Sequence, residues 1–121
     1  MSHESGSVTA SREARVVVRF IDGEEVSCVI DTGFSGELML PRSVAEQLDL
    51  RIIGQEEFET VGTHVLIADI SLAEVFWLGN QRTLEVIISD GDDALIGTEM
   101  LATTRLSIDY VGGGVAIIGV A

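Results

Sequence analysis

The feature that most constrains this chain is a short apolar run that leads directly into an acidic turn. Residues 26–30 are mostly apolar, and Asp31-Thr32-Gly33 follows at once. A strand that is apolar on both faces is expected to be buried. A carboxylate at the point where that burial ends normally needs a partner or a function. Asp31 is therefore the first candidate functional residue. Thr32 can fix the neighbouring backbone, and Gly33 permits a close backbone approach.

A second motif lies near the C-terminal end of the chain. Residues 94–101 read Ala-Leu-Ile-Gly-Thr-Glu-Met-Leu, and a mixed apolar stretch follows at residues 106–110. The Asp-Thr-Gly turn together with Leu95-Ile96-Gly97 resembles the retropepsin-like aspartic proteases, in their small, single-lobe cellular form. The resemblance covers residues 13–121. It implies that Asp31, Thr32 and Gly33 form the catalytic turn and that the apolar-apolar-Gly stretch packs beneath it.

The resemblance implies a mainly β fold, namely a closed acid-protease-type β-barrel with one or two short helices and one lobe in each chain. A length of 121 residues fits a single domain with its own core. Residues 1–12 are polar, rich in serine and without periodicity, which predicts a disordered N-terminal tail. Residues 13–121 are then the protease domain.

Local patterns predict the elements of this domain. Asp22-Gly23 separates two strand-like runs, residues 15–21 and 25–31, and predicts a hairpin because both turn residues tolerate positive φ. Pro41 suits the first position of a helix over residues 41–48, and a second short helix is expected over residues 98–102. Further strands are expected over residues 75–78, 83–88, 105–109 and 115–121.

The resemblance also suggests residues that contact a substrate. Retropepsins close a flap hairpin over the substrate, and the matching hairpin here is expected over residues 60–72, with Val61, Gly62 and Thr63 near its tip. Phe34 follows the Asp-Thr-Gly turn and is bulky enough to narrow a pocket beside it. Leu95 begins the apolar stretch beneath the turn. Retroviral relatives have an arginine after that stretch, whereas this chain has Thr98 and Glu99.

Asp93 is the remaining candidate for substrate binding. In retroviral relatives the residue two positions before the apolar pair lines the primary substrate pockets and is apolar, and the matching residue here is acidic. Asp90 and Asp92 precede it. A carboxylate facing a substrate Lys or Arg would favour a basic residue next to the scissile bond. The alternative is that these aspartates form a solvated turn.

The chemistry that the resemblance implies is endopeptidase hydrolysis by two aspartates around a shared water. The chain contains one Asp-Thr-Gly motif, so the second aspartate must come from a second copy of the chain, and a homodimer acting on a peptide or protein substrate is expected. The apolar residues 115–121 are expected in its interface, because a terminal strand would otherwise expose an unpaired edge. The alternative is that Asp31 only caps a turn, in a non-catalytic binding or dimerisation module with the same fold.

Composition argues against several other classes of function. Seven basic and 20 acidic residues give a formal net charge of −13, which is unsuitable for nucleic acid. Cys28 is the single cysteine, and His3 and His64 are the two histidines, so no metal site and no cofactor are expected. No signal peptide or membrane-spanning run is recognised, and a cytoplasmic protein is expected.

Overall fold

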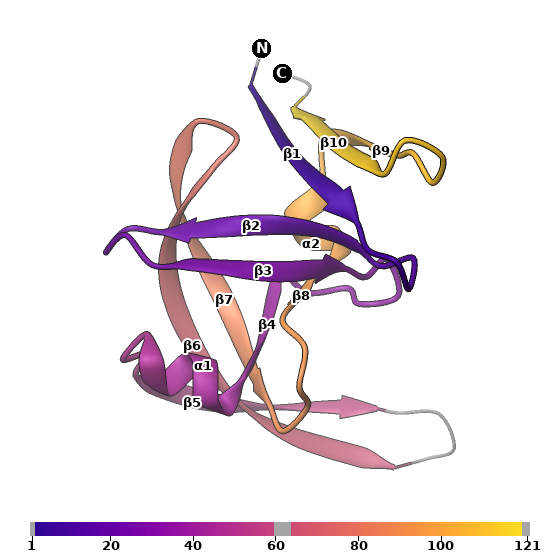
Figure 1. Cartoon of the computed structure of the whole chain (residues 1–121). Coiled ribbons are helices and arrows are strands. Elements are labelled where there is room, and N and C mark those ends of the chain that lie inside the picture. Colours follow the sequence, from indigo (N-terminus) through magenta and orange to yellow (C-terminus); the bar gives the residue numbers. More distant parts are fainter. Residues whose placement is uncertain (1, 60–63, 120–121) are drawn as a thin grey trace.

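The computed structural model describes residues 2–59 and 64–119, which form a β-rich fold with two short helices (Figure 1). Strands β1 to β4 span His3–Val8, Ala14–Phe20, Glu25–Ile30 and Leu38–Pro41, and helix α1 spans Arg42–Gln47. Strands β5 to β8 span Ile52–Glu59, Val65–Trp77, Asn80–Ser89 and Leu95–Ile96. Helix α2 spans Thr98–Leu101, and β9 and β10 span Thr104–Ile108 and Gly114–Gly119. Neither helix is long and apolar enough to cross a membrane.

The strands form one sheet that curls back on itself. Its order is β5-β6-β7-β4-β8-β3-β2-β1-β10-β9, and β6 also pairs with β2. This extra pairing closes β2, β3, β8, β4, β7 and β6 into a ring. Most neighbours run antiparallel, but β3 pairs with β8 and β4 with β7 in parallel. Because β3 and β8 are parallel, their C-terminal ends lie side by side, and the Asp-Thr-Gly turn follows the C-terminal end of β3.

The core lies inside this ring because alternate residues of each strand point inward. On β2, for example, Val16, Val18 and Phe20 are buried while Val17 and Arg19 are exposed. Cys28 on β3 and Ile96 on β8 are fully buried opposite them. This two-residue period is the signature of a strand with one covered face. The predicted hairpin between β2 and β3 is confirmed, with Gly23 at a φ of +96° in its turn.

The expectation of a disordered tail over residues 1–12 does not agree with the structure. His3–Val8 forms β1, which lies between β2 and β10 and pairs with both. Polar residues suffice because both neighbouring strands supply backbone hydrogen bonds, and alternate β1 side chains remain exposed. Gly6 is required there, since a Cβ atom at this position would lie 1.9 Å from the carbonyl oxygen of Arg15.

The hairpin expected over residues 60–72 is longer than the sequence suggested. Its first strand is β5, which pairs with β6 from Ile52↔Ser71 to Glu59↔Val65. Gly54 lies inside β5 at a register shift, where an unpaired residue is tolerated. The tip residues Val61, Gly62 and Thr63 lie outside the described residues.

The reason for placing residues 115–121 in a dimer interface was also wrong. Strand β10 has no free edge, since it pairs with β1 on one side and β9 on the other within the same chain. The two ends of the described chain lie close together at the top of Figure 1. A dimer, if it forms, does not need β10 to complete an open sheet edge.

Candidate active site

The Asp31 turn is shaped by backbone hydrogen bonds on both sides of the carboxylate. The Asp31 amide donates to the carbonyl of Ile96 at 2.9 Å, which ties the end of β3 to β8. The Gly33 amide donates to Asp31 Oδ1 at 2.9 Å, and the Phe34 amide donates to the Asp31 carbonyl at 3.1 Å. An aspartate that accepts from the amide two residues later is held in a fixed orientation. Asp31 is half-buried, and Thr32 and Gly33 are exposed beside it.

Strand β8 and the start of α2 support this turn from below. Val29 is level with Leu95 and Ile30 with Ile96. Beyond β8, the Gly97 amide donates to the Glu37 carbonyl at 3.0 Å, and the Thr98 amide donates to the Phe34 carbonyl at 2.8 Å. The two sequence motifs are therefore in direct contact through their backbones, as the resemblance implied.

Gly97 allows this contact because no side chain would fit. A Cβ atom at Gly97 would lie 2.1 Å from the Gly36 carbonyl oxygen and 2.7 Å from both Cδ2 and the carbonyl oxygen of Phe34. The Phe34 ring is half-buried and lies over Gly36 and Gly97. Phe34 thus helps to close the turn, and its packing accounts for a bulky residue at this position.

A carboxylate that the sequence analysis missed braces the other end of the turn. Glu37 accepts a hydrogen bond from Arg82 Nη2 at 2.7 Å and another from the Glu85 amide at 3.0 Å. The Glu37 side chain is 18% exposed and that of Arg82 35%. This pair joins the residues before β4 to β7, 45 positions later in the sequence. No local motif marks it, and only the parallel pairing of β4 with β7 brings the two together.

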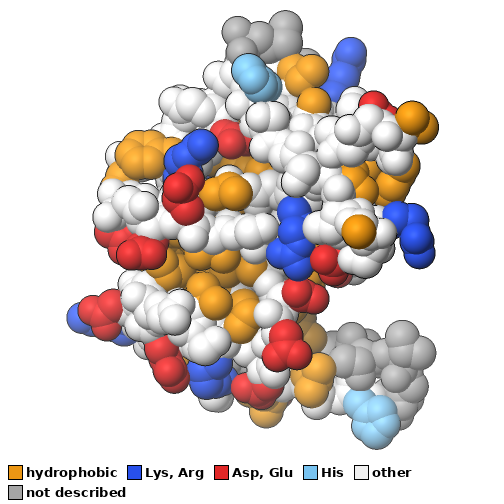
Figure 2. All heavy atoms as spheres, in the orientation of Figure 1, with side chains coloured by type: hydrophobic (Ala, Val, Ile, Leu, Met, Phe, Trp, Pro, Cys, Tyr) orange, Lys and Arg blue, Asp and Glu red, His pale blue; other side chains and the backbone are white. Residues whose placement is uncertain are grey.

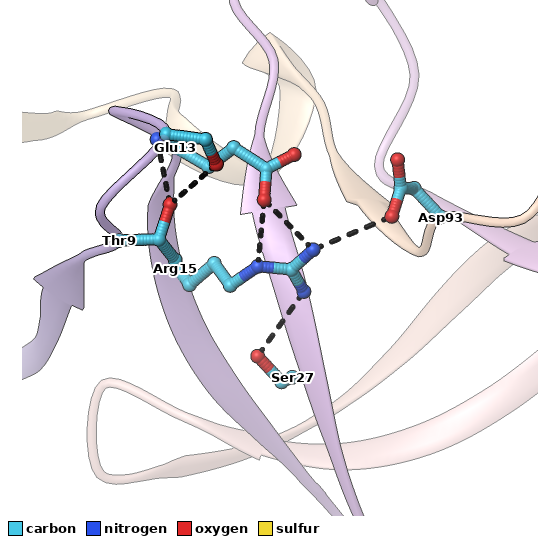
Figure 3. A network of polar contacts seen from close by, with 6 residues as sticks. Thr9, Glu13, Arg15, Ser27 and Asp93 are labelled. Carbon is cyan, nitrogen blue, oxygen red and sulfur yellow. Dashed lines mark hydrogen bonds and ion pairs between the residues drawn. The ribbon is translucent and has the colours of Figure 1, made fainter.

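Asp93 lies on the loop before β8 and is bound by an arginine of its own chain (Figure 3). Arg15 Nη2 is 3.3 Å from Asp93 Oδ1 and 3.1 Å from Glu13 Oε1. The acidic loop is also held at its start, where Arg42 contacts Asp90 as well as Asp69. Asp90 and Asp93 therefore each have an arginine partner, while their side chains are 92% and 55% exposed to solvent.

No three His, Cys, Asp or Glu side chains within residues 2–59 and 64–119 are grouped so that they could hold a metal ion. Cys28 is fully buried in the core, and burial raises the pKa of its thiol to about 12. A thiol with so high a pKa is not a nucleophile at neutral pH. Cys28 fills space in the core.

The structure brings most of the predicted site residues together. Asp31, Thr32, Gly33 and Phe34 form one turn, Leu95 lies beside it on β8, and Asp93 begins the approach to β8. The β5–β6 hairpin projects away from the body of the molecule, and a hollow separates the two in Figure 2. Val65, Leu66 and Ile67 on this hairpin are 55%, 59% and 62% exposed.

Comparison with known proteins agrees with this geometry. A family model described as aspartyl protease matches residues 16–100. The chain is similar in structure to a retropepsin-like aspartic protease from Rickettsia conorii, with a TM-score of 0.71 and 15% identity, over 97% of this chain and 90% of that one. No curated protein matches the sequence significantly.

Two viral structures are similar as well. The EIAV protease, solved with the inhibitor HBY-793, matches with a TM-score of 0.61 and 12% identity over 78% of this chain and 90% of that one. A foamy viral protease-reverse transcriptase, solved with an RNA/DNA hybrid, matches with a TM-score of 0.56 and 18% identity, over 79% of this chain and 13% of that one. These matches confirm the mainly β, acid-protease-type fold. The chain belongs to the aspartyl protease family and has the fold of a single-lobe, retropepsin-like member.

Proposed function

We propose that this protein is an aspartic endopeptidase whose dyad is formed by Asp31 from each of two identical chains. The observation that carries the proposal is the Asp31 carboxylate, oriented by the Gly33 amide at the end of β3. Among the described side chains, no arginine forms an ion pair with it. A half-buried carboxylate that no described arginine binds can approach a second carboxylate.

The chemistry follows from the repulsion between two such groups. Two carboxylates a few ångströms apart do not both ionise easily, so the pair retains one proton over a range of pH. The ionised member accepts a proton from a water between them, and the protonated member donates to the oxygen of the scissile carbonyl. The apparent pKa values belong to the pair and not to either residue. Activity should therefore be highest at mildly acidic pH.

The β5–β6 hairpin is suited to cover the substrate in this proposal. Its apolar side chains Val65, Leu66 and Ile67 are more than half exposed. Strand alternation puts Val65 and Ile67 on one face of β6 and Leu66 on the other, so the hairpin offers exposed apolar area on both faces, and the face turned toward an extended peptide could bury it. A bound peptide would then lie between this hairpin and the Asp31 turn. Phe34 and Leu95 would contact it from the body of the molecule.

The first test replaces the proposed catalytic carboxylate and a matched control. Asp31→Asn is nearly isosteric but cannot act as a general base, so we expect proteolysis of an unstructured protein such as casein to fall to background. Asp22 is the control, because its Oδ1 accepts from the Glu24 amide at 3.0 Å in the same local geometry. Asp22→Asn should cleave at the wild-type rate. Cleavage by Asp31→Asn at that rate would refute the mechanism.

A second test asks whether the dyad is shared between chains. Adding excess Asp31→Asn protein to the wild type should lower the activity further than dilution alone, because mixed dimers have one carboxylate. Sedimentation of the wild type over a range of concentrations should show a dimer wherever activity is found. Activity that sediments with a monomer would rule out a shared dyad.

One observation favours the alternative function, a non-catalytic binding module. The first and last strands of the described residues, β1 and β10, each pair on both sides within the chain, so neither is open to join a partner's sheet. In that case the protein would stay monomeric at high concentration and Asp31→Asn would bind its partners unchanged. The same sedimentation experiment separates the two functions.

A further inference from the structure

The β5–β6 hairpin leaves the main sheet at one residue of β6. From Asp69 onward β6 pairs with β7, whereas residues 65–68 pair only with β5. Residues 56–59 and 65–68 therefore form a two-stranded ribbon, and its large apolar side chains on β6 are more than half exposed. A ribbon of two strands is only weakly stabilised by its own pairing. Its direction relative to the rest of the molecule depends on contacts at its base.

Asp69 makes such contacts through both oxygens of its carboxylate. Arg42 Nη1 donates to Oδ2 at 2.9 Å, and Gln55 Nε2 donates to Oδ1 at 3.0 Å. Gln55 is the cross-strand partner of Asp69 on β5, and Arg42 is the first residue of α1, directly after β4. Together the two hydrogen bonds join both strands of the hairpin to the body of the molecule, at the level where the ribbon begins to project (Figure 1).

The bond from Arg42 to Asp69 is the stronger of two that the same guanidinium makes. The Asp69 side chain is 18% exposed, so this ion pair is partly shielded from solvent. Asp90 accepts from Arg42 Nε at 3.4 Å, but its side chain is 92% exposed. The hydrogen bonds from Gln55 and Arg42 lower the pKa of Asp69 below its ordinary value of 3.8, so Asp69 stays ionised at mildly acidic pH.

We propose that Arg42 is a positioning residue: through Asp69 it fixes the direction of the ribbon, and with it the place of the ribbon's apolar side chains relative to the Asp31 turn. Without this bond the ribbon samples several directions, of which only some cover a bound peptide. The apparent affinity for a peptide then falls in proportion to the fraction of molecules in a competent direction. The fixed direction is a property of the fold, whereas its effect on cleavage rests on the proposed function.

A distance measurement by pulsed electron paramagnetic resonance tests the structural part of the proposal. Spin labels are attached at Glu57→Cys on the ribbon and at Glu99→Cys on α2, which are both exposed positions. Cys28 takes no label, because it is buried and its thiol has a pKa of about 12. An excess of unlabelled protein removes distances between subunits. We expect one narrow distance distribution in the otherwise wild-type protein and a measurably broader one with Arg42→Gln or Asp69→Asn.

Asp90→Asn is the matched control, because it removes the other carboxylate that the same guanidinium contacts. Its distance distribution should stay as narrow as that of the wild type. Asp69→Asn is nearly isosteric, so it still tests the bond if Arg42→Gln fails to fold. A narrow distribution with both Arg42→Gln and Asp69→Asn would overturn the proposal. Broadening of equal size with Asp90→Asn would overturn it as well, since the bond to Asp69 would not be what fixes the ribbon.

Steady-state cleavage of a peptide measures the effect on the reaction. Arg42→Gln and Asp69→Asn should each raise KM about three- to tenfold at nearly unchanged kcat, as expected for the loss of a partly shielded ion pair. The double variant should raise KM no further than either single variant, because both remove the same bond. A merely structural role would lower kcat and the melting temperature without raising KM. An unchanged KM in a variant with a broadened distribution would refute the role of Arg42 in substrate binding.

The two measurements separate this proposal from the proposed function. If the wild type shows no Asp31-dependent cleavage, the proposed function fails, but the distance distributions still decide whether Arg42 fixes the ribbon. If the wild type cleaves and the distribution stays narrow with Arg42→Gln and Asp69→Asn, only the role of Arg42 is refuted.

Discussion

Replacement of Gly97 by alanine is the sharpest test of how the Asp31 turn is built. The backbone at Gly97 has φ −98° and ψ 179°, which any residue adopts, so alanine adds no backbone strain. Its Cβ atom, however, would lie 2.1 Å from the Gly36 carbonyl oxygen. The two segments would have to separate by about 1 Å to reach an ordinary contact distance.

The magnitude follows from what that separation disturbs. Forcing an extra carbon into a packed contact costs about 1–3 kcal/mol. The movement also lengthens two hydrogen bonds. The Thr98 amide donates to the Phe34 carbonyl at 2.8 Å in the wild type, and the Glu99 amide donates to the Gly36 carbonyl at 3.2 Å. Weakening them adds roughly 1 kcal/mol. We expect Gly97→Ala to lower the free energy of unfolding by about 2–4 kcal/mol, and the melting temperature by roughly 10 °C.

Urea and thermal unfolding followed by circular dichroism measure this change. Gly114→Ala is the matched control, because a Cβ atom at Gly114 would meet nothing within 4 Å and its φ is not positive. That variant should lie within about 0.5 kcal/mol of the wild type. If Gly97→Ala proves as stable as Gly114→Ala, the close packing of the two motifs is not what holds the turn.

Three further predictions concern the remainder of the fold. Burial and the Glu56 and Glu37 carboxylates raise the pKa of Glu85 above its ordinary value of 4.5. The free energy of unfolding of the wild type therefore falls as the pH rises from 4 toward 7, because the folded protein holds this proton more tightly than the unfolded chain does. Glu85→Gln should melt at a higher temperature than the wild type at pH 7 and by a smaller margin at pH 4, and an equal difference at both pH values would contradict this. Arg82→Met leaves the Glu37 carboxylate without its cation and should cost about 1–2 kcal/mol in urea unfolding, less if Glu37→Gln is added. Cys28, buried and with a pKa of about 12, should react with a thiol reagent at pH 8 only when the protein unfolds, and rapid labelling of the native protein would contradict its place in the core.

The candidate site was predictable only where its chemistry is local. Asp31, Thr32 and Gly33 are adjacent in the sequence, and their turn follows from a buried strand that ends in a carboxylate and a glycine. Their support by Leu95 was reached through the resemblance of two short motifs to a known family. The partners of Asp93 and Glu37 were not predictable from local sequence. Asp93 meets Arg15 only when β2, β3 and β8 have paired, and Glu37 meets Arg82 only when β4 and β7 have paired.

The sequence by itself determined the elements whose cause is local. Asp22-Gly23 made the β2–β3 turn because Gly23 tolerates positive φ. A helix follows Pro41, but Pro41 itself, expected as the first helical residue, is the last residue of β4, and α1 begins at Arg42. Tertiary structure decided the rest. The polar β1 became a strand because β2 and β10 offered hydrogen bonds on both sides, and Asp93 became half of an ion pair because β2 and β8 both flank β3. Backbone pairing between distant segments has no local signature, since any extended chain can supply the donors and acceptors.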